Sequence, residues 1–179
     1  MLTSWFWNAI ARTLAKPRVA AWLIRRAQRT PYFHLVKRGE VYMYRWWLFN
    51  PYDHETRKRK YPWVPFSVRV HRIMKPDDDR HLHDHPWNAR TVILRGSYIE
   101  ETPATMPGSL SLPAAHAREQ HYRVASGTHQ LRPGQYHRIT HVTSRGAYTL
   151  FITGKNQSDW GFLVDGKKIP WKEYLGIKE

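Results

Sequence analysis

Three histidines alternate along one short stretch of the sequence, HLHDHPWN at residues 81–88: His81, His83 and His85. In an extended strand, alternate residues lie on one face, so the spacing predicts that neighbouring imidazoles can bind one ion. Neutral imidazole is a good ligand for Fe, Zn, Mn, Ni and Cu. The chain has no cysteine, which excludes thiolate metal sites, disulfides and a cysteine nucleophile. The row therefore indicates a metal site built from nitrogen ligands.

Only two members of the row can bind the same ion. His81 lies roughly 13 Å from His85 along an extended strand, at about 3.3 Å per residue, whereas a ligand nitrogen lies about 2.0–2.2 Å from a zinc-like ion. The pair is therefore either His83 with His85 or His81 with His83. The third ligand must come from elsewhere, and the candidates are His71, His116, His121, His129, His137 and His141. His137 is favoured because it follows the turn RPGQY and begins the short strand HRITHV.

Two segments of the sequence resemble the metal-binding motifs of the cupin superfamily. In HDHPWNARTVILRG, His83 and His85 stand at the His-x-His positions of the first motif, and in PGQYH, Gly134 and His137 stand at the glycine and ligand positions of the second. The resemblance implies a jelly-roll barrel, also called a double-stranded β-helix. It favours His83, His85 and His137 as the ligands of one ion, with His81 as the alternative ligand.

The resemblance covers roughly residues 66–154 and departs from the usual cupin pattern at one ligand. Cupins usually carry a Glu four or five residues after the second His, and here those positions are Ala89 and Arg90. Without this Glu, the sequence resembles the three-histidine branch of the superfamily, of which cysteine dioxygenase and related thiol dioxygenases are the familiar members. The resemblance implies a non-haem Fe(II) oxygenase that acts on a small anionic substrate, with Zn, Ni or Mn as the alternative metals. It assigns no catalytic side chain.

The same branch implies where a substrate would bind. Its members carry a Tyr-Arg pair on an upstream strand near the substrate carboxylate, and Tyr44 and Arg45 are the counterparts in this sequence. Arg90 and His141 are two further candidates for substrate binding.

The elements that must position these residues are predicted to be mostly strands. From Tyr32 onward, short apolar or alternating runs such as EVYMYRWWLF and FSVRVHRIM are separated by Gly, Pro and Asp turns, a pattern typical of strands. Many short strands predict an all-β sandwich or barrel. We expect an N-terminal helical segment over residues 1–30 and a barrel domain over residues 31–179. Within the helical segment, Ser4 is the expected N-cap, and Pro17 ends one helix or starts another.

The charge of the chain predicts anionic partners. It has 29 Lys and Arg against 14 Asp and Glu, a net charge of +15, which attracts anions. A non-catalytic cupin module that binds an anionic ligand or nucleic acid is therefore the alternative to an enzyme, and an acidic membrane surface is a third candidate partner. The aromatic-rich stretch at residues 158–175 either folds over the barrel mouth or contacts a second copy in a homodimer.

The cytoplasm is the predicted compartment. No segment approaches the roughly 18–20 apolar residues needed to cross a bilayer, and the first residues lack the positively charged start of a secretory signal.

Overall fold

The fold is mainly β, as predicted, with helices at the two ends of the chain. The computed structural model describes residues 2–53, 55–56, 58–104 and 117–177. Two helices, α1 (Leu2–Leu14) and α2 (Pro17–Ala27), come first. Then follow strands β1 (Leu35–Lys37), β2 (Glu40–Phe49), β3 (Ser67–Ile73), β4 (Leu82–His83), β5 (Trp87–Arg95), β6 (Ser97–Pro103), β7 (Arg118–Val124), β8 (Thr128–Leu131), β9 (Arg138–Val142), β10 (Ala147–Asn156), β11 (Gly161–Val164) and β12 (Lys167–Pro170), and the one-turn helix α3 (Trp171–Tyr174).

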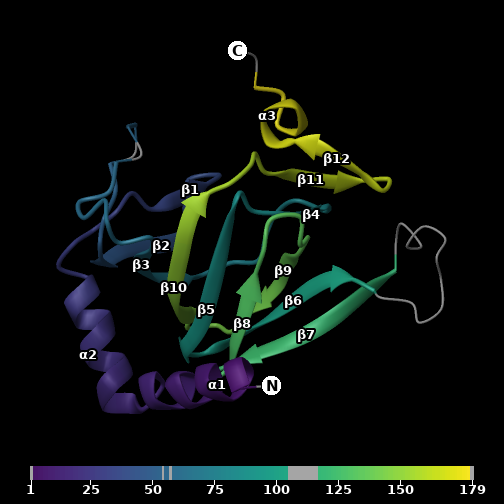
Figure 1. Ribbon diagram of the computed structural model, residues 1–179. Helices are drawn as coiled ribbons and strands as arrows, with labels where there is room; N and C mark the ends of the chain where they lie inside the picture. Colours follow the sequence, from purple (N-terminus) through teal and green to yellow (C-terminus); the bar gives the residue numbers. More distant parts are fainter. Residues whose placement is uncertain (1, 54, 57, 105–116, 178–179) are drawn as a thin grey trace.

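The strands form a barrel with jelly-roll connectivity (Figure 1). One sheet has the order β1-β2-β3-β10-β5-β8 and another has the order β7-β6-β9. An antiparallel bridge between His83 and His137 places β4 beside β9, and β4 also pairs with β11. Nearly every connection between consecutive strands therefore crosses from one row to the other, where the rows are β3-β10-β5-β8 and β4-β9-β6-β7. The strand pairs within these rows are antiparallel. This is the architecture that the sequence predicted.

The two N-terminal helices cover the outer face of the large sheet (Figure 1). In α2 the buried residues are Ala20, Leu23, Ile24 and Ala27, a spacing that puts one apolar stripe on one side of the helix. This stripe belongs to the same hydrophobic core as Val68, Val70, Val92, Leu94 and Leu150 of the sheet. The helices are thus part of the main core. No helix among the described residues is long and apolar enough to span a membrane.

One detail of the helical prediction was wrong. Because α1 begins at Leu2, Ser4 lies inside the helix and is not its N-cap. Pro17 begins α2, where its fixed backbone angle suits the first turn and its missing N–H costs nothing.

The inner face of β3 carries polar residues into the barrel. Val68 and Val70 face the helices, so the alternating residues Arg69, His71 and Ile73 face inward. Ile73 packs in one cluster with Tyr98 and Ile139, which come from the opposite rows of strands. The interior is therefore apolar around Ile73 and polar toward Arg69.

The C-terminal segment packs over the end of the barrel where β4 lies (Figure 1). Phe162 of β11 stands opposite His83 in the β4–β11 pairing, and Tyr174 of α3 stacks on Phe162 with ring centroids 3.8 Å apart. Gly161 permits this arrangement, because a Cβ at this position would lie 2.3 Å from the carbonyl oxygen of Ile169. Of the two roles predicted for residues 158–175, the structure shows packing over the barrel.

Candidate metal centre

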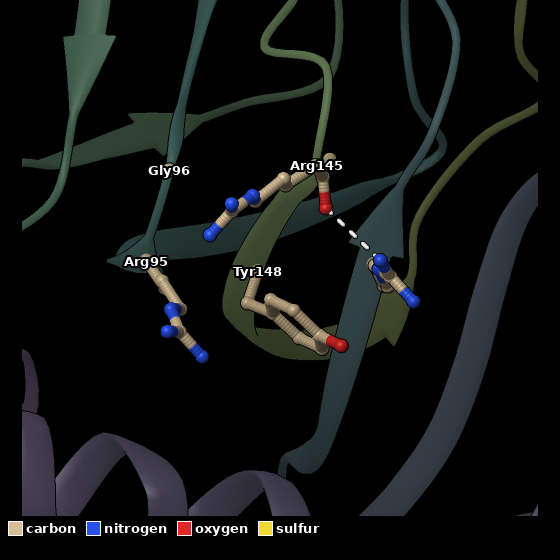
Figure 2. Close-up of a pocket in the computed structure, with 6 residues that line it drawn as sticks. Arg95, Gly96, Arg145 and Tyr148 are labelled. Atoms are coloured by element: carbon tan, nitrogen blue, oxygen red, sulfur yellow. Dashed lines mark hydrogen bonds between the residues drawn. The ribbon is translucent and has the colours of Figure 1, made fainter.

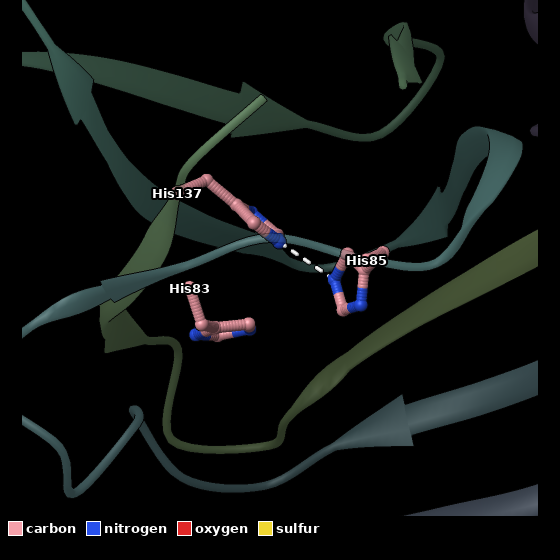
Figure 3. A group of neighbouring side chains, drawn as sticks. All are labelled: His83, His85 and His137. Carbon is pink, nitrogen blue, oxygen red and sulfur yellow. Dashed lines mark hydrogen bonds between the residues drawn. The ribbon is translucent and has the colours of Figure 1, made fainter. Parts of the chain in front are cut away.

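Three imidazoles converge inside one end of the barrel (Figure 3). Each of His83, His85 and His137 offers one ring nitrogen, and these atoms all lie within 4.8 Å of one another. The Nε2 atoms of His85 and His137 are 2.9 Å apart. Two nitrogens that each lie about 2.0–2.1 Å from one ion can be at most about 4.2 Å apart, so the group fits one ion after small side-chain rotations. Among the described residues, no other group of this kind is found.

The short strand β4 positions His83 beside His137. His83 and His137 exchange two backbone hydrogen bonds, each 2.9 Å long, which fixes the two chain segments side by side. The strand ends at His83, so the three alternating histidines do not lie on one continuous strand. His81 turns the other way, and its Nδ1 lies 2.9 Å from the Tyr174 hydroxyl. The structure thus brings His85, and not His81, to the other two imidazoles.

Asp84, between the two histidines, ties the surrounding loops together. It is fully buried, and its carboxylate accepts hydrogen bonds from the backbone N–H of Gly161 at 2.8 Å and of Gly134 at 3.2 Å. The ammonium of Lys168 lies 2.7 Å from the same carboxylate. One side chain therefore holds together the His-Asp-His segment, the turn before His137 and the C-terminal hairpin.

Glu100 of β6 lies directly behind His137. Its Oε1 is 2.6 Å from Nδ1 of His137, and its Oε2 is 2.7 Å from the guanidinium of Arg123. Only 1% of Glu100 is exposed. A carboxylate at this distance requires a proton on Nδ1, which leaves the Nε2 lone pair directed at the other imidazoles, as in many metal sites where a carboxylate orients a ligating histidine. Burial alone would raise the pKa of Glu100, but His137, His129 and Arg123 hold this pKa well below its usual range.

Burial keeps two of the three imidazoles, His83 and His85, uncharged. Burial, followed by the neighbouring His137, lowers the pKa of His83 to about 4. The same two causes hold the pKa of His85 well below its usual range. Since a histidine must be neutral to bind a metal, both side chains are in the ligating form at neutral pH.

Aromatic rings surround the three histidines. Trp87 stacks on His85 with ring centroids 4.4 Å apart, and Phe162 and Trp160 contact His83 at 5.9 Å and 6.2 Å. These rings exclude bulk water from the sides of the site and restrict the imidazole orientations.

Deeper in the barrel, two arginines and a histidine have buried side-chain nitrogens without a hydrogen-bond partner. Nη2 of Arg45, Nε of Arg69 and Nε2 of His71 are buried and have no hydrogen-bond partner. Arg69 is 3% exposed, and neither arginine takes part in an ion pair among the described residues. Burial and then Arg69 lower the pKa of Arg45 to about 10, so this side chain stays charged at neutral pH. Charges that are largely buried without an ion-pair partner are costly, which makes this wall of the barrel a candidate site for an anion.

The remaining candidates from the sequence lie away from this cluster. Tyr44 is on the outer face of β2 and packs with the helical core. Arg90 also faces outward, with its guanidinium 4.7 Å from the centroid of the Trp7 ring in α1. His141 is exposed on β9. Of the four candidates for substrate binding, only Arg45 contributes to the polar wall.

Sequence reasoning did not single out Glu100 or Arg69, and it considered His71 only as a possible metal ligand, not as part of the polar wall. The alternating run FSVRVHRIM carried a signal for the last two, because two basic residues alternate there with buried valines. For Glu100 the signal was weaker, and consisted of an acidic residue within the strand SYIEETP.

Comparisons with known proteins found no match to the sequence among family models or curated proteins. Solved structures resemble the chain in shape. They include the substrate complex of Fe(II) HppE, with a TM-score of 0.48 and 11% identity over 72% of this chain and 58% of that one. Another is the formate complex of Lactobacillus farciminis oxalate decarboxylase, with a TM-score of 0.49 and 13% identity over 83% of this chain and 36% of that one. A third is the Cupin_2 domain of an XRE family transcriptional regulator from Enterobacter cloacae, with a TM-score of 0.39 and 15% identity over 65% of this chain and 99% of that one. The chain thus spans little more than half the length of HppE and about a third of the length of the oxalate decarboxylase. At these TM-scores, the comparisons carry no argument about the activity of the chain.

Proposed function

We propose that the chain is a cupin-type metalloenzyme in which His83, His85 and His137 bind one divalent metal, with Fe(II) as the working metal and a small anion as the substrate. The observation that carries the proposal is the convergence of three imidazoles inside a barrel, of which burial keeps His83 and His85 neutral. Bound Fe(II) with open coordination positions would supply oxygenase chemistry.

The side chains around the cluster have defined tasks in this proposal. Glu100 holds the proton on Nδ1 of His137 and so keeps Nε2 available. Asp84 holds the segment between the other two ligands in place through its backbone and lysine contacts. Trp87 and Phe162 limit the access of water to the imidazoles.

The substrate's anionic group would bind at the wall formed by Arg45, Arg69 and His71. A carboxylate there would accept from the unsatisfied donors of all three residues. Contacts between rings connect this wall to the histidines, since Arg69 lies 5.6 Å from the centroid of Phe151, Phe151 lies 5.5 Å from Trp87, and Trp87 stacks on His85. A small substrate could therefore be held by its anionic end while its other end reaches the metal site.

Metal titration tests the first part of the proposal. The metal-free chain is reconstituted anaerobically with Fe(II), Mn(II), Ni(II) or Zn(II), and the bound metal is measured by elemental analysis. We expect one ion per chain in the wild type and none in His137→Ala, with His141→Ala as the matched control from the same segment. Stoichiometric metal in a folded His137→Ala variant would contradict the assignment.

Oxygen uptake separates the enzyme from the alternative, a non-catalytic module that binds an anionic ligand. The Fe(II)-loaded chain is screened against small thiol-bearing and other carboxylates. Uptake that depends on both iron and the carboxylate, and that is lost in Arg69→Gln, supports the enzyme. Carboxylate binding without uptake, with any of the four metals, would favour the binding module.

A further inference from the structure

A hollow lined by arginines lies at the other end of the large sheet (Figure 2). It has a volume of about 380 Å³, and its lining residues are Arg72, Arg95, Gly96, Arg145, Gly146 and Tyr148. Arg95 ends β5, and the 9 residues of this strand span roughly 26 Å at about 3.3 Å per step. Since His85 precedes the start of β5, the hollow is separate from the metal centre.

Strand register builds one side of the hollow. Tyr148 of β10 pairs with Arg72 of β3 on one side and with Arg95 of β5 on the other. Directly paired residues in neighbouring strands point to the same face of a sheet. Two guanidinium groups therefore stand on either side of one phenol ring, and the guanidinium of Arg72 lies 5.3 Å from the centroid of this ring.

Two glycine turns bring a third arginine to the same place. Gly96 and Gly146 have φ of 78° and 75°, in the left-handed region that favours glycine. A Cβ at Gly96 would lie 2.5 Å from the carbonyl oxygen of Gly146, so the two turns are in direct contact. Arg145, next to the second glycine, is thereby held close to Arg95, as Figure 2 shows.

The positive charge of the hollow has no acidic partner among the described residues. None of their acidic side chains lines it, and their ion pairs include none of its three arginines. Arg72 donates one hydrogen bond from Nη2 to the backbone oxygen of Arg145 at 3.1 Å, while its Nε is buried and has no partner. Arginine side chains that line one hollow are suited to an anionic ligand with several oxygens.

We propose that this hollow binds the phosphate group of a small phosphate monoester. Guanidinium groups match phosphate oxygens in pairs of hydrogen bonds, and several arginines around one hollow suit a dianion better than a carboxylate. The volume falls within the range of about 300–1,000 Å³ that is usual for small-molecule sites, which leaves space for part of the esterified group. Nucleic acid is less suited, because its regularly spaced phosphates need a track of cations, whereas these arginines line one hollow.

Isothermal titration at low salt with inorganic phosphate and with phenyl phosphate tests this proposal. We expect both to bind the wild type, phenyl phosphate more tightly. The double variant Arg95→Gln/Arg145→Gln should bind phenyl phosphate about tenfold more weakly or worse, because it removes the charge-assisted hydrogen bonds of two guanidinium groups. Arg25→Gln, an exposed arginine on α2, is the matched control and should bind as the wild type does.

Two further measurements test whether the hollow is independent of the metal centre and whether its partner is nucleic acid. His137→Ala should leave phenyl phosphate binding unchanged, since the hollow and the metal centre are separate. Equal binding by the double variant, or no binding by a folded wild type, would overturn the proposal. Tight binding of a single-stranded oligonucleotide that is lost in the double variant, without binding of phenyl phosphate, would also overturn it and would identify nucleic acid as the partner.

Discussion

Replacing Glu100 by Gln should weaken metal binding although Glu100 touches no metal. The carboxylate serves two donors at once, with Oε1 at Nδ1 of His137 and Oε2 at Arg123. An amide of the same shape has only one acceptor atom, so it must face one of these donors with its own NH₂ group. If the NH₂ group faces His137, it favours the tautomer with the proton on Nε2, which cannot bind a metal.

The expected loss follows from known effects of such orienting groups. Removal of the partner of a ligating histidine typically costs 10–100-fold in metal affinity, or about 1.4–2.7 kcal/mol. Glu100→Ala should also destabilise the fold, by about 3–5 kcal/mol, because Glu100 is buried and its removal leaves Arg123 and His137 unpaired. Glu100→Gln is therefore the more informative variant, since it keeps the volume and most of the packing.

The assay is competition between the protein and a chelator for Zn(II) or Co(II), with urea unfolding of the metal-free protein measured in parallel. Glu101→Gln is the matched control. Glu101 is the next residue on β6 and pairs with Arg118 at 3.1 Å and Arg138 at 3.5 Å, away from the three histidines. A folded Glu100→Gln variant that binds metal within about twofold of the wild type would refute the orienting role, as would an equal loss in Glu101→Gln.

Four further expectations can be checked in the same preparations. His85→Ala should abolish tight metal binding while His81→Ala stays within a few fold, and the reverse result in chelator competition would move the ligand pair to His81 and His83. Asp84→Ala should lower the free energy of unfolding in urea by about 1–3 kcal/mol, because it leaves buried donors without an acceptor. The loss is smaller than for a fully buried ion pair, since the lysine partner is 36% exposed; a loss well below this range would mean that the loops hold together without Asp84. Burial lowers the pKa of His129 from 6.5 to about 4, so protonation favours the unfolded chain between these values. The stability of the metal-free protein is then complete above about pH 6.5 and falls as the pH drops toward 4, by about 2 kcal/mol from this group at about pH 5, and urea titrations should show a shallower fall in His129→Gln. Arg69→Met should leave the ligand-free protein as stable or more stable, because it removes a buried charge that has no ion-pair partner, and should abolish any thermal stabilisation by small carboxylates.

Local patterns in the sequence were enough to predict the class of the fold. The alternating run at residues 40–49 coincides with β2, and Pro86 and Gly96 bound β5 on its two sides. Such patterns are local because alternate side chains of a strand face opposite ways and because proline and glycine interrupt regular pairing. The sequence alone also selected His83, His85 and His137 as one ligand set, through spacing and resemblance.

Tertiary structure decided the surroundings of that set. An alternating pattern separates two faces of a strand, but it does not say which face is enclosed or which strands become neighbours. Whether Arg45 or Tyr44 faces the interior depends on where α2 covers the sheet, and the contact of Glu100 with His137 joins residues 37 positions apart. The end of β4 at His83 and the hydrogen bond between His81 and Tyr174 likewise need the C-terminal segment in place. These contacts exist only once the jelly roll has closed, because closure brings distant strands together and excludes water from between them.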